Sequence, residues 1–251
     1  FEGLPLDQAD EMDILEANGS VNFGSNKAYR AMLKKIKAGS PATNPDDLQY
    51  ILDNVDVDNL FEYMALEMFV GNSDIGNIRY YRLHQEGSKW KWIWYDADYG
   101  LYSSKFNSPW SYLKVKGMGE QKIDNTIFLK LLEHPDYKRK FLEKLADVYK
   151  TFTTEYMTQV LDGVVAEIQP EMKNHWERWG ELNDKAVTSE VPTTIDGAYT
   201  YWESRVNRLY NTLKVRPHRL WDFIKDEFKL TKTEMEELFG PQPDYPDDAV
   251  L

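Results

Sequence analysis

The sequence has no cysteine among its 251 residues. This absence excludes disulfide bonds, thiolate metal sites and a cysteine nucleophile, and it fits either an exported or a cytosolic protein. No run of about 18 apolar residues occurs, so we expect no transmembrane helix. Positive charge is also scarce, since 30 Lys and Arg stand against 42 Asp and Glu and give a net charge of −12. This balance argues against nucleic acid as the main partner, because binding a phosphate backbone needs a basic face, but it leaves room for a nucleotide held through a metal.

Histidine is scarce as well, with 4 residues in the chain. The stretch from His175 to Trp179 therefore lacks the further ligands that a histidine metal site needs, and helix packing is the better interpretation. The alternating acids of residues 53–59 are similar to a calcium loop but lack its Gly and its closing Glu, so Asp58 is expected to cap a helix. The chain opens at Phe1 without a starting Met or a signal peptide, which suggests a mature or trimmed product.

Aromatic residues are abundant, with 16 Tyr, 11 Phe and 8 Trp. Such a content suits a helical core with bulky side chains, and it would also suit a sugar-binding surface. We expect four tryptophans at helical positions to lie in the core, namely Trp176, Trp179, Trp202 and Trp221.

Apolar residues at helical spacing predict that most of the chain is α-helix. Pro170 predicts a kink or break in one long helix, and Gly71 is expected to end another. The expected helices cover residues 26–37, 46–52, 58–71, 125–133, 136–152, 153–179, 194–213, 217–228 and 231–239.

One β-hairpin interrupts the helices. Its strands are expected over 78–83 and 89–95, joined by a turn at 85–88, and a long loop over 101–122 follows. We therefore predict an α+β, mostly helical fold in a single domain of residues 1–251. Its parts are an N-terminal segment (1–25), a hairpin-bearing site region (26–123), a helical region (124–239) and a loose tail (240–251).

The hairpin carries polar side chains at both of its ends. A hairpin brings its ends together, so Asp74 and Asn77 at one end should face Asp96 and Asp98 at the other. Asp96 and Asp98 are two apart, so on a strand they would leave the same face and repel each other unless a cation lay between them. Hard divalent cations prefer such oxygen ligands, and Mg²⁺ at phosphates is commonly held by one or two carboxylates. The pattern thus makes phosphoryl transfer a candidate reaction.

Each half of this pattern also has a simpler interpretation. Asp74 could accept the proton of an attacking hydroxyl, but Asn, Ser, Asp and Gly around it also form Asx turns. Asp96 and Asp98 could equally be solvated acids at the end of a strand.

Several stretches resemble a known family. They are Gly71-Asn72-Ser73-Asp74, Ile78-Arg79-Tyr80-Tyr81-Arg82 with Asn77 before it, Lys91 to Gly100 with Trp-Tyr-Asp-Ala-Asp-Tyr-Gly, Ile14 to Gly19, Leu132 to Lys138, and Glu171 to Trp179. Together they resemble the spore coat protein H (CotH) kinase family over most of residues 10–230.

Members of that family are atypical protein kinases of spore coats and exported bacterial proteins. The resemblance implies a protein-kinase-like large lobe with a central hairpin and a C-terminal helical bundle. It also implies ATP, Mg²⁺ or Mn²⁺, a protein substrate with Ser or Thr, and a secreted or cell-surface location. By motif position, Asp74 is the catalytic-loop Asp, Asn77 and Asp96 bind cofactor and metal, and Asp98 is a second metal-binding acid.

The sequence departs from the family in two places. The link from Asp74 to Asn77 is shorter than in the family, and nothing before residue 26 is long enough to supply the small lobe and phosphate-contacting Lys that kinases use. We therefore expect a kinase that lacks its small lobe. Two alternatives stay open: a non-catalytic binding or scaffold module of a cell-surface or secreted assembly, and a carbohydrate-active protein with Asp96 or Asp98 in an acid/base pair and Trp platforms.

Overall fold

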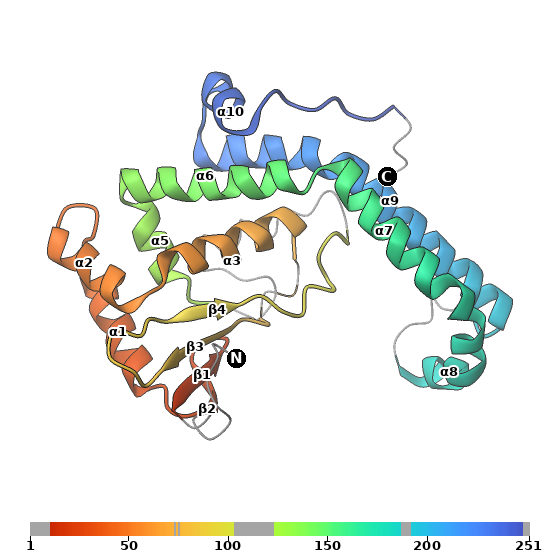
Figure 1. Ribbon diagram of the computed structural model, residues 1–251, viewed down its shortest axis with the longest axis horizontal. Coiled ribbons are helices and arrows are strands. Elements are labelled where there is room, and N and C mark those ends of the chain that lie inside the picture. Colours follow the sequence, from red (N-terminus) through yellow and green to blue (C-terminus); the bar gives the residue numbers. More distant parts are fainter. Residues whose placement is uncertain (1–10, 73, 75, 103–122, 187–191, 248–251) are drawn as a thin grey trace.

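The chain folds into helices stacked over a small antiparallel sheet, the mostly helical α+β class expected from its sequence (Figure 1). The computed structural model describes residues 11–72, 74, 76–102, 123–186 and 192–247, without the side chains of 180–186. In Figure 1 α3 (Val57–Val70) lies above the sheet, and α6 (Pro135–Thr151) lies above α3. Nearly all of the long loop expected over 101–122 is outside the described residues.

The sheet has four strands in the order β2-β1-β3-β4. The expected hairpin is present as β3 (Arg79–Leu83) and β4 (Lys91–Ile93), and Arg79 is paired with Ile93. β4 ends two residues earlier than expected. The other two strands, β1 (Met12–Glu16) and β2 (Ser20–Phe23), lie in the N-terminal segment and were not anticipated. β1 pairs with the distant β3 and β2 pairs with β1, so the local sequence shows no signal beyond a few alternating residues.

The helices before and after the hairpin agree closely with expectation. α1 (Lys27–Ala38) and α2 (Pro45–Asn54) precede α3, while α5 (Thr126–Leu132) precedes α6. α3 begins slightly earlier than predicted, because its cap is Asp56, which accepts a hydrogen bond from the Asn59 N–H at 3.1 Å, and not Asp58. α3 ends at Gly71, whose φ of 63° is the left-handed conformation that glycine adopts readily.

Pro170 breaks the next helix as predicted. α7 (Thr154–Ile168) gives way to a 3₁₀ turn, η2 (Gln169–Glu171), before α8 (Met172–Ala186). Together with residues 195–210 of α9 (Ile195–Phe228), these elements form an arm that projects from the body of the molecule (Figure 1).

Pro217 does not break α9, although two separate helices were expected there. A proline lacks the N–H that would bond to the carbonyl four residues earlier, which here belongs to Leu213. The Thr154 hydroxyl donates to that carbonyl at 3.1 Å, so the group that proline leaves unpaired is satisfied from α7. The last helix, α10 (Lys232–Phe239), follows, and residues 240–247 run along α9, where the Trp221 indole N–H donates to the Gly240 carbonyl at 3.2 Å.

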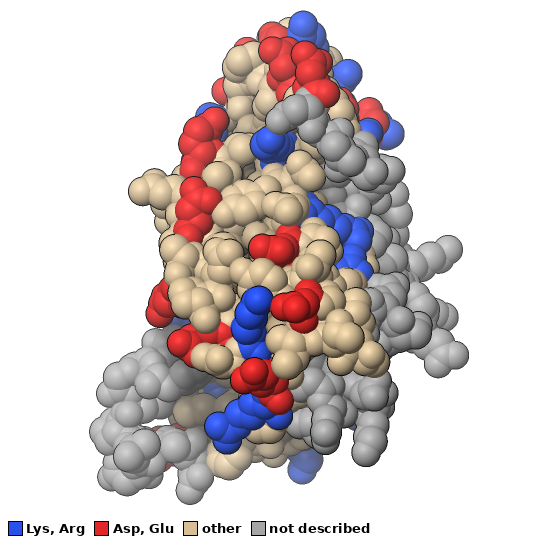
Figure 2. Space-filling model, turned by 90° about the vertical axis from the view of Figure 1, so that its right-hand side faces the viewer, with Lys and Arg blue, Asp and Glu red and all other residues tan. Residues whose placement is uncertain are grey.

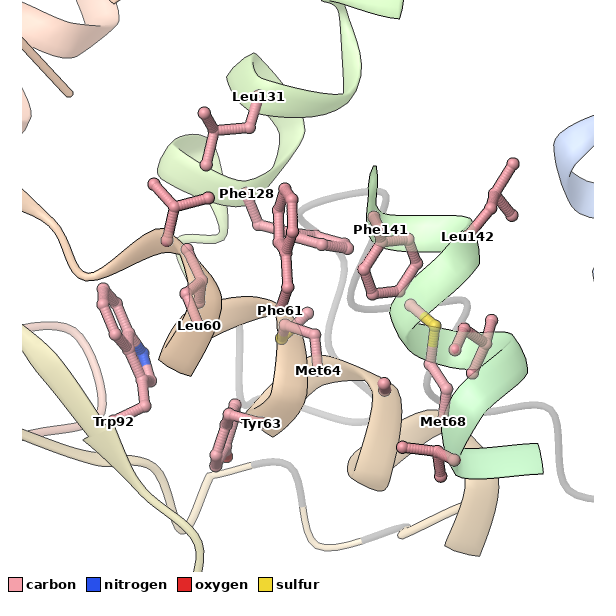
Figure 3. Packing of buried hydrophobic residues seen from close by; sticks show 14 of the residues in the cluster. Leu60, Phe61, Tyr63, Met64, Met68, Trp92, Phe128, Leu131, Phe141 and Leu142 are labelled. Atoms are coloured by element: carbon pink, nitrogen blue, oxygen red, sulfur yellow. The ribbon is translucent and has the colours of Figure 1, made fainter. Parts of the chain in front are cut away.

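The core lies between α3, α5 and α6 (Figure 3). Phe61 of α3 meets Phe128 and Phe141 with ring centroids 6.0 and 5.4 Å apart, and the side chains point toward one another in Figure 3. Much of the aromatic content is therefore core. Trp221 is buried as expected, whereas Trp179 on the arm is exposed, so its assignment to the core was wrong.

Candidate functional site

The site is built at the C-terminal end of α3. The helix turns sharply at Gly71, whose N–H donates to the Glu67 carbonyl at 3.0 Å, and the chain then enters residues 72–77. The second half of the site, residues 94–101, leaves the end of β4 and returns to the same helix end. There the Leu101 N–H donates to the Val70 carbonyl at 2.6 Å. Both segments are thus fastened to one rigid element.

The return of the second segment depends on Gly100. Its N–H donates to the Ala97 carbonyl at 2.8 Å, closing a turn. A Cβ at this position would lie 2.8 Å from that carbonyl oxygen and 3.0 Å from the side chain of Val70. Glycine is therefore required here by the close approach of the chain to α3.

Asn72, Asp74 and Asn77 make the turn-type hydrogen bonds that the composition of this segment predicts. The side-chain oxygen of Asn72 accepts from the backbone N–H of Asp74 at 3.0 Å, which is an Asx turn. The backbone N–H of Asn77 lies 3.4 Å from the Asp74 carbonyl oxygen. Turn chemistry and a functional arrangement are compatible, because this turn is what directs the Asp74 side chain.

The structure brings Asp74, Asn77 and Asp96 together. The Asn77 side-chain amide nitrogen donates to Asp74 Oδ2 at 3.0 Å and to Asp96 Oδ2 at 2.6 Å. Because both oxygens contact one nitrogen, their separation cannot exceed the sum of these distances, which is within reach of a shared ion. Asp74 is half-buried and Asp96 is exposed, so both carboxylates are open to a ligand.

Asp98 does not take part in the hydrogen bonds that join Asp74, Asn77 and Asp96. It is exposed, and it makes no hydrogen bond or ion pair with any described residue. The expectation that both acids leave one face of a strand was wrong, because β4 ends at Ile93 and strand alternation stops there. Asp96 itself has a φ of 54°, in the left-handed region where Asp and Asn are the most common residues after glycine.

The acids of the site are not neutralised by any described basic residue. Within the described part of the chain, no Lys or Arg forms an ion pair with Asp74, Asp96 or Asp98. The same described residues also hold no group of three or more His, Cys, Asp or Glu that could bind a metal by itself. Two carboxylates and one amide instead match the partial ligand set of Mg²⁺, which takes its remaining ligands from water and substrate phosphates. A half-turn of the Asn77 amide would present its oxygen in place of its nitrogen.

Sequence reasoning missed Glu67, whose carboxyl group lies beneath the site. The side chain is 3% exposed, and burial raises the pKa of this carboxyl to about 7 despite hydrogen bonds from Asn72, Trp94 and Tyr63 that favour the charged form. Its only sequence signal is an acid inside a run of otherwise apolar residues in α3.

Arg216 is a second residue that the sequence did not indicate. It comes from α9, is 1% exposed, and donates from Nη2 to the Met68 carbonyl at 2.7 Å and from Nε to the Phe69 carbonyl at 2.9 Å. Burial lowers the pKa of its guanidinium to about 9. These carbonyls belong to the last turn of α3, whose oxygens have no partner within the helix, so Arg216 caps the helix that carries the site.

Comparison with known proteins finds a family whose model, described as CotH kinase protein, matches residues 6–220. No significant match was found among curated proteins or among solved structures.

Among the described residues, no helix combines the length and the apolar character needed to cross a membrane. The face seen in Figure 2, on the side where the arm projects, shows acidic side chains interspersed with a few basic ones.

Proposed function

The chain belongs to the CotH kinase family, and on this basis we propose that it is an atypical protein Ser/Thr kinase that uses ATP with Mg²⁺ or Mn²⁺. Asp74 is the catalytic residue, Asn77 and Asp96 contact the metal and its nucleotide, and Asp98 is a further metal-binding acid. The substrate is a protein with Ser or Thr, and the place of action is the cell surface or the secreted fraction of a bacterium.

The observation that carries this proposal is the position of Asn77. Its amide nitrogen lies within hydrogen-bonding distance of one carboxylate from each end of the hairpin, at 3.0 and 2.6 Å. Two acids that far apart in the sequence, with no basic partner among the described residues, repel each other unless a cation or a donor lies between them. This is the arrangement that a metal-dependent phosphoryl transfer site needs.

Each residue then has a defined task. Asp74, half-buried and held by the Asx turn, accepts the proton of the substrate hydroxyl as that oxygen attacks the phosphorus. Asp96 and the oxygen of Asn77 hold the cation. When bound, the cation neutralises charge on the phosphate oxygens. The chain itself contributes mainly position, since phosphoryl transfer depends on alignment and charge more than on covalent chemistry.

The test is transfer of radiolabelled phosphate from ATP to casein, with Asp74→Asn as the blank. Asp147→Asn is the matched control, because Asp147 is exposed on α6 and belongs to neither segment of the site. The proposal predicts labelling in the wild type and in Asp147→Asn, dependent on Mg²⁺ or Mn²⁺, and none in Asp74→Asn. Equal labelling in all three proteins would contradict it.

A non-catalytic binding or scaffold module is the second candidate. The same two hydrogen bonds favour it, because the Asn77 amide holds both carboxylates without any cation. This candidate predicts a folded protein that neither binds Mn²⁺–ATP nor transfers phosphate. The carbohydrate-active alternative needs Asp96 or Asp98 in an acid/base pair, and no described residue makes a hydrogen bond or ion pair with Asp98.

A further inference from the structure

Glu67 is a buried acid that the phosphoryl transfer chemistry does not use. It lies on α3 one turn before Gly71, its side chain is 3% exposed, and no Lys or Arg pairs with it within the described part of the chain. A buried carboxyl without a basic partner is costly unless donors satisfy it. Here three donors converge on it, from the side chains of Asn72, Trp94 and Tyr63.

Two of these donors belong to the two halves of the site. Asn72 is 2% exposed and gives its amide nitrogen to Glu67, which leaves its oxygen for the Asp74 N–H at 3.0 Å. Trp94 lies two residues before Asp96 and donates its indole N–H to the same carboxyl. One carboxyl group therefore contacts both the segment that carries Asp74 and the segment that carries Asp96.

The donor set explains why an acid stands at this position. The indole N–H of Trp94 can only donate. The side-chain oxygen of Asn72 already accepts from the Asp74 N–H, so Asn72 bonds to Glu67 through its NH₂ group, which is also a donor. A carboxyl group offers two oxygens to these donors, whereas a glutamine would offer one oxygen and turn an NH₂ group toward the others. An apolar side chain would offer none, although the surrounding face of α3 is apolar.

We infer that Glu67 is a positioning residue that joins the two halves of the site, acting on Asp74 through Asn72 and on Asp96 through Trp94. The inference rests on the proposed function for its catalytic meaning. The connection between the two segments is a property of the fold, so hydrogen exchange can test it without any measurement of kinase activity.

The experiment compares Glu67→Met, which has similar length and no acceptor, with Glu67→Gln, which keeps one acceptor oxygen. Glu62→Gln is the control, because Glu62 is exposed on the same helix. Two hydrogens are followed by exchange in ¹H–¹⁵N spectra, the Trp94 indole N–H and the Asp74 backbone N–H, together with backbone amides of α6 as a reference. Mn²⁺–ATP affinity is measured on the same proteins by calorimetry.

In Glu67→Met we expect both hydrogens to exchange roughly tenfold faster relative to α6, and Mn²⁺–ATP affinity to fall by a similar factor, as for the loss of one or two hydrogen bonds. Glu67→Gln should lie between this variant and the wild type, and Glu62→Gln should match the wild type. Unchanged exchange at both hydrogens in Glu67→Met would overturn the inference. If the wild type binds no Mn²⁺–ATP, the proposed function fails, and the exchange rates still decide whether Glu67 joins the segments.

Should Glu67→Met fail to fold, Trp94→Phe removes one donor from a side chain that is 43% exposed and keeps a ring in its place. Trp179→Phe is its control, because Trp179 is also 43% exposed and lies on the arm. The inference predicts faster exchange of the Leu101 amide, which fastens the second segment to α3, and weaker Mn²⁺–ATP binding in Trp94→Phe alone. Identical behaviour of the two variants would overturn it.

Discussion

At the scale of single residues, Asp96 must both adopt a left-handed backbone conformation and present a carboxylate to Asn77. Its φ of 54° favours Asp, Asn or Gly, and its carboxylate accepts from Asn77 while facing open solvent. Aspartate is one of the few side chains that serves both demands. Glu67 likewise combines burial with three donors, and Asn72 combines donation to Glu67 with acceptance from Asp74.

Substitutions at Asp96 can test its backbone conformation separately from its carboxylate. Asp96→Asn keeps the tolerance for positive φ and an oxygen for Asn77, so its free energy of unfolding should stay within about 1 kcal/mol of the wild type. Asp96→Val places a β-branched residue at the same φ and should lose about 1–2 kcal/mol more. Urea unfolding measures both. Equal stability of the two variants would mean that the left-handed conformation at residue 96 costs nothing.

Glu67 should give the protein a pH-dependent stability. Its folded pKa of about 7 lies above its usual value of 4.5, so the folded state keeps the proton more tightly. The stability this contributes is fully present below pH 4.5 and is lost as pH rises through about 7. Between pH 5 and pH 8 the wild type should therefore lose up to about 3 kcal/mol more than Glu67→Gln. Urea unfolding at both pH values tests this, with Glu62→Gln expected to follow the wild type. Parallel behaviour of the wild type and Glu67→Gln would contradict the burial cost.

At the scale of elements, α3 organises the site, because its last four carbonyls all have partners from the chain segments around it. Glu67 accepts from Gly71, Val70 accepts from Leu101, and the carbonyls of Met68 and Phe69 accept from Arg216. Unpaired carbonyls at a buried helix end are costly, so these partners fix the helix end and the segments that leave it.

The continuity of α9 across Pro217 depends on Thr154. Thr154→Val keeps the shape of the side chain but removes the hydroxyl that donates to the Leu213 carbonyl at 3.1 Å. We expect a loss of about 1–2 kcal/mol in the free energy of unfolding, because that carbonyl has no helical N–H to replace it. Thr154→Ser should restore most of the loss. A Thr154→Val protein as stable as the wild type would show that the carbonyl is satisfied in another way.

Local sequence patterns predicted the helices, the hairpin and the meeting of Asp74, Asn77 and Asp96, since each depends on residues close together in the chain. They failed where distant segments decide the outcome. β1 forms by pairing with β3, α9 passes Pro217 because of a hydroxyl from α7, and Arg216 reaches α3 from the far end of the chain. The strand geometry expected for Asp96 and Asp98 was wrong because the early end of β4 could not be read from its apolar sequence.

At the scale of the whole molecule, the body and the arm differ in burial. α3 buries most of its side chains, whereas α7 buries none and exposes Tyr156, Val160, Val164 and Ile168. Elements with few buried side chains open more easily. The site therefore lies on the well-packed body, close to where α9 passes from body to arm.

Hydrogen exchange should show this division. Backbone amides of α7 are expected to exchange faster than those of α3 and α6, because opening the arm exposes little buried apolar surface. Exchange followed by mass spectrometry on the native protein measures it. Equal protection of α7 and α3 would show that the molecule opens as one unit.

The proposed function requires that Asp74, Asn77 and Asp96 form a metal-dependent nucleotide site. Calorimetric titration with ATP in the presence and absence of Mn²⁺ tests it most directly, on the wild type, Asp96→Asn and the control Asp147→Asn. We expect binding that requires Mn²⁺ in the wild type and in Asp147→Asn, and an affinity at least about tenfold lower in Asp96→Asn, because one charged metal ligand is lost. ATP binding that is indifferent to Mn²⁺, or equal in wild type and Asp96→Asn, would contradict it.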